Sequence, residues 1–341
     1  MASTVTSRPD TPLLRVAHLR TVFTLADGRD AAAVDDVSFT IGRGETLGLV
    51  GESGSGKSVT ALSIVRLVLP PGRIVQGTIE LEGENLMALD EAALRRLRGR
   101  RIGFIFQEPM VALNPVYTIG YQIAETLAVH RLARGHAGRR RAVELLEAVR
   151  VPDPGRRARE YPHQLSGGLR QRAMIALALA AEPQLVIADE PTTALDVTVQ
   201  AEILDLLRDM RRQFHLSLLL ITHDLGVIAE MADRVAVMYA GRIVEQAPVA
   251  DLFAAPAHPY TRGLLDSIPG VQPAARLRAI PGVVPAIGSL PAGCAFAPRC
   301  PDRFEPCDTE PPGITTIADG TRDVRCYLHG VPARTGRGTR S

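Results

Sequence analysis

The 341-residue sequence predicts an α/β fold built around a mostly parallel sheet. Apolar runs of strand length alternate with segments whose apolar residues recur at helical spacing. Two of these runs end directly in polar residues: Leu185–Ala188 precedes Asp189, and Leu216–Thr222 precedes His223. A glycine-rich loop at residues 51–58 lies between an apolar run and a helical segment. Strands that end in polar residues and glycine loops indicate a site at the carboxyl ends of parallel strands.

The composition is that of an ordinary globular protein. Hydrophobic residues make up 46% and charged residues 22% of the chain, and the formal net charge is +2. This small charge gives no general attraction to nucleic acid, so we expect no nucleic-acid partner. No apolar run approaches the roughly 18–20 residues needed to span a bilayer. The first twelve residues lack the apolar segment of a signal peptide, so we expect a cytoplasmic protein.

The chain divides by composition into four segments. Residues 1–12 are expected to be disordered, and residues 331–341 form a basic tail with the same expectation. Residues 13–250 are expected to form the main domain, with an antiparallel β-rich start and a helical subdomain at about residues 108–180. Residues 251–330 are dense in proline and glycine and are expected to form a separate extension that is poor in regular structure. Within the main domain we expect strands at Leu13–Leu19, Val34–Phe39, Thr46–Val50, Ile74–Leu81, Ile102–Gln107, Val235–Tyr239 and Ile243–Gln246, and helices at Val59–Leu69, Leu89–Leu97, Gln122–Arg131 and Arg139–Val149.

Residues 51–58 match the phosphate-loop pattern G-x-x-x-x-G-K-[ST]. In such a loop the backbone N–H groups point inward at phosphate oxygens, and the following helix adds its partial positive charge. Lys57 would reach the β- and γ-phosphates, and the Ser58 hydroxyl would bind Mg²⁺. The alternative is a glycine turn with a chance lysine, which the strand and helix on either side disfavour. The expected phosphate contacts come from Gly51, Glu52, Ser53, Gly54, Ser55, Gly56, Lys57 and Ser58.

Two carboxylates follow the apolar run at 185–188. Asp189 stands where a second group would hold Mg²⁺ through water. Glu190 would point to the other side and would orient or deprotonate an attacking water. A pair of acids that only caps a helix is the alternative.

A second anion site is predicted at Ser166–Gly168, within the run LSGGLRQR. Ser166 is suited to cap the following helix, and the two glycines allow close backbone approach to an anion.

Residues 13–250 resemble the ATP-binding subunit of an ABC transporter. The resemblance depends on six features in this order: the phosphate loop, Gln107 after a strand, LSGGLRQR, LVIADE, TTALD and ITHD. The resemblance implies a P-loop NTPase cassette that closes as a dimer around ATP. It assigns hydrolysis to Glu190, γ-phosphate and water positioning to His223, and contact with Mg²⁺ and the membrane-facing loop to Gln107. Ser166 and Gly168 would act across the dimer.

Further positions carry an expectation from the same resemblance. Asp196 resembles the contact that links the two sites of the dimer, and Phe23 is the candidate that stacks on adenine. Leu169 stands where the family usually has glutamine, as in the peptide-importer branch.

Four segments resemble the oligopeptide and dipeptide importers within this family: residues 107–125, HPYTRGLL, IPGVVP and PAGCAFAPRCP. That branch implies a second ATPase subunit (identical or a paralogue), two transmembrane permease subunits and an extracytoplasmic peptide-binding protein. The chain would then lie on the cytoplasmic face of the inner membrane as a peripheral subunit that powers peptide import. Nickel or another small solute is the alternative cargo. A non-transport ABC ATPase and a non-catalytic regulatory subunit are less favoured, because the chain has one cassette and intact motifs.

Cys294, Cys300, Cys307 and Cys326 all fall in the last fifth of the chain. Clustered cysteines in a cytosolic protein are more often metal ligands than disulfides. The spacing contains no C-x-x-C pair, which disfavours a zinc ribbon, and an all-thiolate set suits an iron–sulfur cluster. The branch resemblance also implies a [4Fe–4S] cluster, while zinc and unligated thiols stay open as alternatives.

Overall fold

A mixed eight-stranded sheet forms the centre of the protein. The computed structural model describes residues 11–267, 280–318 and 320–330, so the predicted disorder of residues 1–10 and 331–341 lies outside the described residues. The strand order is β11-β12-β10-β9-β3-β8-β7-β6, with β6, β7, β8, β3 and β9 parallel and β10, β12 and β11 joined antiparallel. This arrangement confirms the predicted α/β class. The strands are β3 (Thr46–Val50), β6 (Ile102–Ile105), β7 (Leu185–Asp189), β8 (Ser217–Thr222), β9 (Arg234–Tyr239), β10 (Arg242–Pro248), β11 (Thr315–Ile317) and β12 (Arg322–Val324).

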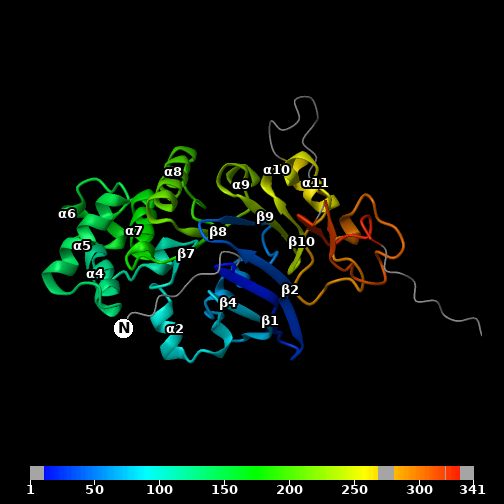
Figure 1. Cartoon of the computed structure of the whole chain (residues 1–341), viewed down its shortest axis with the longest axis horizontal. Coiled ribbons are helices and arrows are strands. Elements are labelled where there is room, and N and C mark those ends of the chain that lie inside the picture. Colours follow the sequence, from blue (N-terminus) through cyan, green and yellow to red (C-terminus); the bar gives the residue numbers. More distant parts are fainter. Residues whose placement is uncertain (1–10, 268–279, 319, 331–341) are drawn as a thin grey trace, which may run out of the picture.

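A smaller antiparallel sheet packs against one face of the central sheet (Figure 1). Its strand order is β2-β1-β4-β5. Inward-facing side chains of both sheets and of α1 form one hydrophobic cluster, which includes Leu14, Leu49 and Ile64. Its elements are β1 (Leu14–Thr24), β2 (Asp30–Ile41), β4 (Gly72–Leu81) and β5 (Glu84–Asn85), with α1 (Lys57–Ile64) between the sheets and α2 (Glu91–Leu97) beside them.

Helices between β6 and β7 form a second lobe (Figure 1, green). The side chain of Thr118 accepts a hydrogen bond from the backbone N–H of Tyr121, which explains why α4 begins where it does. Asp196 caps α8 in the same way. Apolar side chains spaced three and four residues apart bury one face of each longer helix. The helices of this lobe are α3 (Pro109–Ala112), α4 (Ile119–Val129), α5 (Gly135–Ala148), α6 (Pro154–Arg157) and α7 (Gly167–Leu179), while α8 (Val197–Phe214) follows β7 and α9 (Leu225–Met231) follows β8.

The C-terminal segment is attached to the main domain through a few short regular elements. It contains α10 (Val249–Ala254), α11 (Pro259–Asp266) and the β11–β12 hairpin, and β12 pairs directly with β10 of the central sheet. Tyr260 and Phe296 are buried in the main hydrophobic cluster. Burial of these large aromatic side chains gives the segment a strong hydrophobic attachment to the domain. No described helix has both the length and the apolar character to cross a membrane.

Candidate functional site

The phosphate loop connects the carboxyl end of β3 to α1. Gly56 caps α1 with φ 103°, a left-handed conformation that favours glycine, and an added Cβ would lie 2.4 Å from the Ala33 carbonyl oxygen. Gly51 approaches the Met238 carbonyl so closely that an added Cβ would lie 2.1 Å from its oxygen. These close approaches explain why both positions must be glycine, and they hold the loop against the sheet.

Lys57 is almost fully buried, with 5% of its surface exposed. Its Nζ donates to the carbonyl oxygens of Gly51 at 2.7 Å and Glu52 at 3.0 Å, so the ammonium group lies inside the curl of the loop. Burial lowers the pKa of Lys57, and the carboxylates of Glu190 and Asp189 oppose that shift. A cation held by two loop carbonyls can exchange those contacts for phosphate oxygens.

Ser58, at the amino end of α1, meets Asp189, at the carboxyl end of β7. The Ser58 hydroxyl donates to Oδ1 of Asp189 at 3.1 Å. Asp189 is 6% exposed, and burial raises its pKa, an effect that the Ser58 hydrogen bond opposes. A hydroxyl and a carboxylate form an oxygen donor set of the kind that Mg²⁺ prefers, so the residues present fit that ion.

Glu190 is the centre of the second group of side chains. Its Oε2 accepts from Nε2 of Gln107 at 3.0 Å and from the Thr193 hydroxyl at 2.7 Å, and its Oε1 lies 3.5 Å from Nδ1 of His223. The structure therefore brings together Gln107, Glu190 and His223, which are far apart in sequence. Thr193 is an addition to the expected set: it falls within the TTALD segment, but no role was assigned to it. Glu190 also adopts φ 46°, an unusual conformation for a residue with a side chain.

Four expected site residues are placed apart from this group in the described structure. Ser166 caps α7, with its hydroxyl accepting from the Leu169 N–H at 3.4 Å, and it is exposed. Gly168 lies against Val199 of α8, and Asp196 caps that helix. Phe23 packs against Gly72 in the small sheet. Among the described residues, none of the four hydrogen-bonds to the phosphate loop.

The C-terminal segment also contributes to the loop. The hydroxyl of Tyr260 accepts a hydrogen bond from the Glu52 N–H at 2.9 Å, and the Arg299 guanidinium forms an ion pair with the Glu52 carboxylate at 3.0 Å. Neither residue was predicted as part of the site. Both stand more than 200 positions beyond the loop, and no spacing rule in the sequence connects them.

All four cysteines line one narrow cavity in the C-terminal segment. They are free thiols; burial raises the pKa of Cys294 and Cys326, and raises that of Cys300 to about 11. Within residues 11–267, 280–318 and 320–330, no three His, Cys, Asp or Glu side chains are arranged to hold a metal ion. The structure therefore does not support the predicted iron–sulfur cluster with a preformed ligand set, although the thiols do share one cavity.

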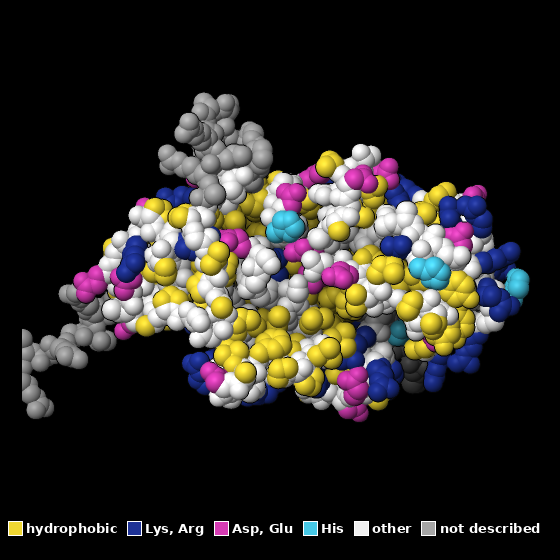
Figure 2. Space-filling view, turned by 180° about the vertical axis from the view of Figure 1, so that it is seen from behind, with side chains coloured by type: hydrophobic (Ala, Val, Ile, Leu, Met, Phe, Trp, Pro, Cys, Tyr) yellow, Lys and Arg dark blue, Asp and Glu magenta, His cyan; other side chains and the backbone are white. Residues whose placement is uncertain are grey.

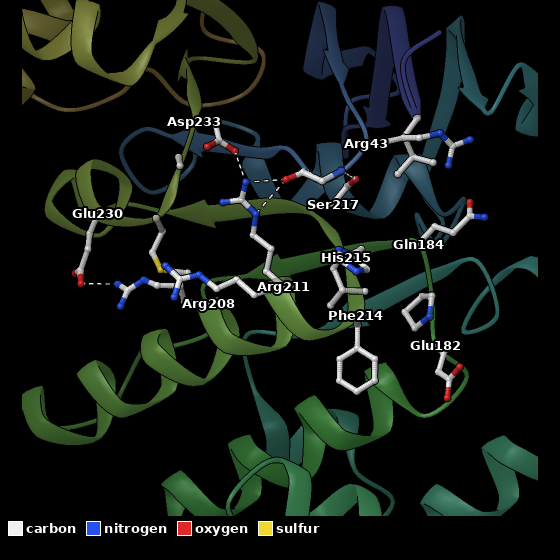
Figure 3. A pocket seen from close by; sticks show the side chains of 17 residues that line it. Arg43, Glu182, Gln184, Arg208, Arg211, Phe214, His215, Ser217, Glu230 and Asp233 are labelled. Carbon is white, nitrogen blue, oxygen red and sulfur yellow. Dashed lines mark hydrogen bonds and ion pairs between the residues drawn. The ribbon is translucent and has the colours of Figure 1, made fainter. Parts of the chain in front are cut away.

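A cavity of about 940 Å³ lies at the opposite edge of the central sheet (Figure 3). It is lined by residues next to the amino ends of β3, β7 and β8, including Gly44, Gln184 and Ser217. Arg211 points across it and donates to Asp233 and to the Gly44 carbonyl, both at 2.7 Å. Because the phosphate loop follows the carboxyl end of β3, this cavity is separate from the candidate nucleotide site.

The fold and the site together define a P-loop nucleoside triphosphatase. Comparison with known families makes this more specific. The family model described as "ABC transporter" matches residues 34–193, and that of "Oligopeptide/dipeptide transporter, C-terminal region" matches residues 244–307.

Two curated relatives extend this similarity over almost the whole chain. The oligopeptide transport ATP-binding protein AppD of Bacillus subtilis (strain 168) is 52% identical, with 93% of this chain and 97% of AppD covered. A protein of Brucella melitensis biotype 1 that carries the name peptide import ATP-binding protein is also 52% identical, with 92% and 97% covered. Among solved structures, the dimeric ATP-binding cassette MJ0796 bound to ADP and Pi has a TM-score of 0.63 and 28% identity, covering 69% of this chain and 98% of that one.

The chain therefore belongs to the ABC transporter family and is an ATP-hydrolysing cassette of the branch with the oligopeptide/dipeptide C-terminal region. The resemblance expected from the sequence motifs is confirmed by these matches.

Proposed function

We propose that this chain hydrolyses ATP to power the import of di- and oligopeptides through a membrane transporter. The observation that carries the catalytic part is the group formed by Gln107, Glu190, Thr193 and His223 beside the phosphate loop. The names of the relatives and the match of the C-terminal region support the peptide cargo. Nickel or another small solute is the second candidate, because the branch resemblance includes such importers.

The phosphate loop and its neighbours would bind the nucleotide. Lys57 would release the carbonyls of Gly51 and Glu52 and bind the β- and γ-phosphates. Ser58 and Asp189 would hold Mg²⁺, which supplies positive charge against the phosphates when it is bound. Phe23 remains our candidate for stacking on adenine, from the small sheet.

Glu190 would act on the attacking water. Hydrogen bonds from Gln107 and Thr193 fix Oε2 of the carboxylate, and Oε1, which lies 3.5 Å from Nδ1 of His223, would face the water. His223, 62% exposed at its side chain, would hold the γ-phosphate and the water from the other side. A carboxylate with one oxygen anchored and the other directed at the nucleophile is suited to a general base.

A second ATPase subunit would complete the site. Ser166 and Gly168 stand at the exposed start of α7, where backbone N–H groups are free to meet an anion from another chain. The dimeric form of the similar cassette MJ0796 supports this arrangement. Asp196 would lie at the contact between the two sites.

The surface after Gln107 is suited to contact a permease subunit. Met110, Val111, Val116, Tyr117 and Tyr121 are all exposed, from 43% to 80%, and the last two rings stack at 4.7 Å. Hydrophobic side chains also gather on the side of the molecule that carries α4 to α6 (Figure 2). Exposed apolar patches of this kind mark interaction sites. We assign as occupant a helix of a permease at the cytoplasmic face of the membrane, with an extracytoplasmic peptide-binding protein on the far side.

We also propose that the cysteine cavity holds an iron–sulfur cluster, most simply [4Fe–4S]. The all-thiol donor set is the basis of this proposal, since each thiolate of a [4Fe–4S] cluster binds a different iron. Anaerobically purified protein should contain iron and sulfide and be coloured, and Cys307→Ser should lose both. Colourless, iron-free protein would overturn the proposal.

Two experiments test the transport function. Lys57→Ala should abolish ATP binding by the purified chain, and unchanged affinity would refute the loop assignment. Uptake of labelled dipeptides, longer peptides and nickel by the reconstituted complex identifies the cargo. Peptide uptake that requires ATP supports the proposal, whereas nickel uptake without peptide uptake would replace it with the second candidate.

A further inference from the structure

Arg299 of the C-terminal segment forms an ion pair with Glu52, the first residue of the phosphate loop that has a side chain. Its Nη1 lies 3.0 Å from Oε1 of Glu52 and its Nη2 lies 3.1 Å from Oε2, so the pair is bidentate. Arg299 is 8% exposed, and the Glu52 side chain is 29% exposed. Two parallel, charge-assisted bonds in a largely water-excluded place give this contact both strength and a fixed geometry.

The guanidinium is held in place by groups other than Glu52. Nε donates to the Pro281 carbonyl at 2.8 Å, and Nη2 also faces the Ile280 carbonyl at 3.4 Å. Nη1 also faces the Tyr239 hydroxyl at 3.4 Å, and the guanidinium carbon lies 5.8 Å from the centre of that ring. Every guanidinium nitrogen therefore faces an acceptor outside the phosphate loop, and these contacts orient Arg299 toward Glu52.

Tyr260 holds the same loop residue through its backbone. Its hydroxyl accepts from the Glu52 N–H at 2.9 Å, and the side chain is fully buried. Burial raises the pKa of Tyr260 well above its ordinary value, so the hydroxyl stays neutral. The start of the phosphate loop is thus fixed at both its side chain and its backbone by the C-terminal segment.

The charge of Glu52 matters for what the loop binds. Its carboxylate acts electrostatically on Lys57, whose Nζ donates to the Glu52 carbonyl. A nucleotide would bring several negative charges to the same loop, and an unpaired carboxylate there would repel them. Arg299 offsets the charge of that carboxylate.

We propose that Arg299 is a positioning residue that orients and neutralises the Glu52 carboxylate, and that this ion pair strengthens the binding of ATP. This inference rests on the nucleotide site proposed above. It gives the C-terminal segment a part in the ATPase site of the same chain, in addition to any cysteine-bound group.

The test is titration of the purified full-length chain with a fluorescent ATP analogue. Arg299→Ala should weaken binding by about 5- to 150-fold, the range of ordinary coupling between sites. Arg303→Ala is the matched control, because Arg303 is an exposed arginine of the same segment that pairs with Asp308 at 2.8 Å. It should bind as the unaltered chain does. If Arg299→Ala and Arg303→Ala bind the ATP analogue with the same affinity, the proposal is overturned.

Double substitution separates a charge effect from a merely structural one. Adding Glu52→Gln to Arg299→Ala removes the unpaired carboxylate and should restore most of the affinity, whereas a structural defect would persist. In the assembled transporter, Arg299→Ala should raise the KM for ATP and leave kcat within about 2-fold, since the group touches no reacting atom. A lowered kcat with an unchanged KM would contradict this.

Two further arms keep the outcome clear. Should Arg299→Ala fail to fold, a comparison of Arg299→Lys with Arg299→Gln decides. Arg299→Lys keeps a positive charge beside Glu52 and should bind ATP more tightly than Arg299→Gln, and equal binding by the two variants would refute the inference. Lys57→Ala reports on the site itself. Normal ATP binding by Lys57→Ala would refute the nucleotide site. If Lys57→Ala loses ATP binding while Arg299→Ala binds ATP normally, only the role of Arg299 is refuted.

Discussion

Glu190→Gln is the sharpest test of the catalytic assignment. The amide has the shape of the carboxylate and can still accept one of the bonds from Gln107 and Thr193 through its remaining oxygen. It cannot take a proton from water. Loss of a positioned general base costs about 10²- to 10⁴-fold in rate, which corresponds to about 2.7–5.4 kcal/mol on the barrier at 1.36 kcal/mol per tenfold. We therefore expect ATP turnover to fall by at least two orders of magnitude.

Nucleotide binding should survive the same change. The substitution removes one negative charge near the phosphates and leaves Lys57, Ser58 and Asp189 in place, so ATP affinity should stay equal or increase. Phosphate release at saturating ATP measures the first effect, and titration with the fluorescent analogue measures the second. A dimer that accumulates with ATP bound would fit both.

Glu182→Gln provides a matched control. Glu182 is also a glutamate with a left-handed backbone, at φ 53° compared with 46° for Glu190, but it lies at the opposite edge of the sheet and pairs with Arg141. Glu182→Gln places glutamine in the same left-handed backbone conformation. It should leave ATP turnover within about 2-fold of that of the unaltered chain, as surface substitutions usually do. Turnover by Glu190→Gln within a few-fold of this control, with intact ATP binding, would refute the role of Glu190.

Further predictions concern the attachment of the C-terminal segment. Glu245, 1% exposed, accepts from Arg322 at 2.9 Å and from two backbone N–H groups, so Glu245→Ala should lower the free energy of unfolding by about 3–5 kcal/mol in urea titrations. Burial lowers the pKa of His258 to about 3, so the folded state loses stability as pH falls below the ordinary value of 6.5. Between pH 7.5 and 5.5 this loss is about 1.4 kcal/mol, and His258→Asn should remove it; an unchanged slope would contradict the assignment. The Cys300 thiol, with its pKa raised to about 11, should react slowly with iodoacetamide at pH 7.5 in metal-free protein, and fast labelling would contradict its burial.

Local patterns were sufficient to predict the side chains that meet at the carboxyl edge of the sheet. The loop at 51–58 follows β3, Asp189 ends β7 and Glu190 follows it, and His223 follows β8. Parallel neighbours place such ends side by side, so motif order alone predicts their convergence. The role of Phe23 is different, because stacking on adenine depends on a distance across two sheets that no spacing rule gives.

The sequence could not predict how the C-terminal segment joins the domain. Its density of proline and glycine indicates irregular structure, yet β12 adds to the central sheet and Tyr260 packs under the phosphate loop. Pairing at a sheet edge and burial of single aromatic side chains leave no periodic signal in a short segment. The cysteines were recognised as a group for their composition, while their common cavity arises from the same tertiary packing.

That packing places the cysteine cavity and the phosphate loop on either side of one short turn. Arg299 stands between Cys294 and Cys300, and the turn is closed by bonds from the Ala297 N–H to the Cys294 carbonyl at 3.0 Å and from the Cys300 N–H to the Ala297 carbonyl at 3.3 Å. A seven-residue turn fixed at both ends has little freedom to move one side chain alone. The arrangement of the cysteine cavity and the direction of Arg299 toward Glu52 therefore depend on the same backbone turn. Through this turn, a segment far along the chain from the phosphate loop contributes a contact to the loop.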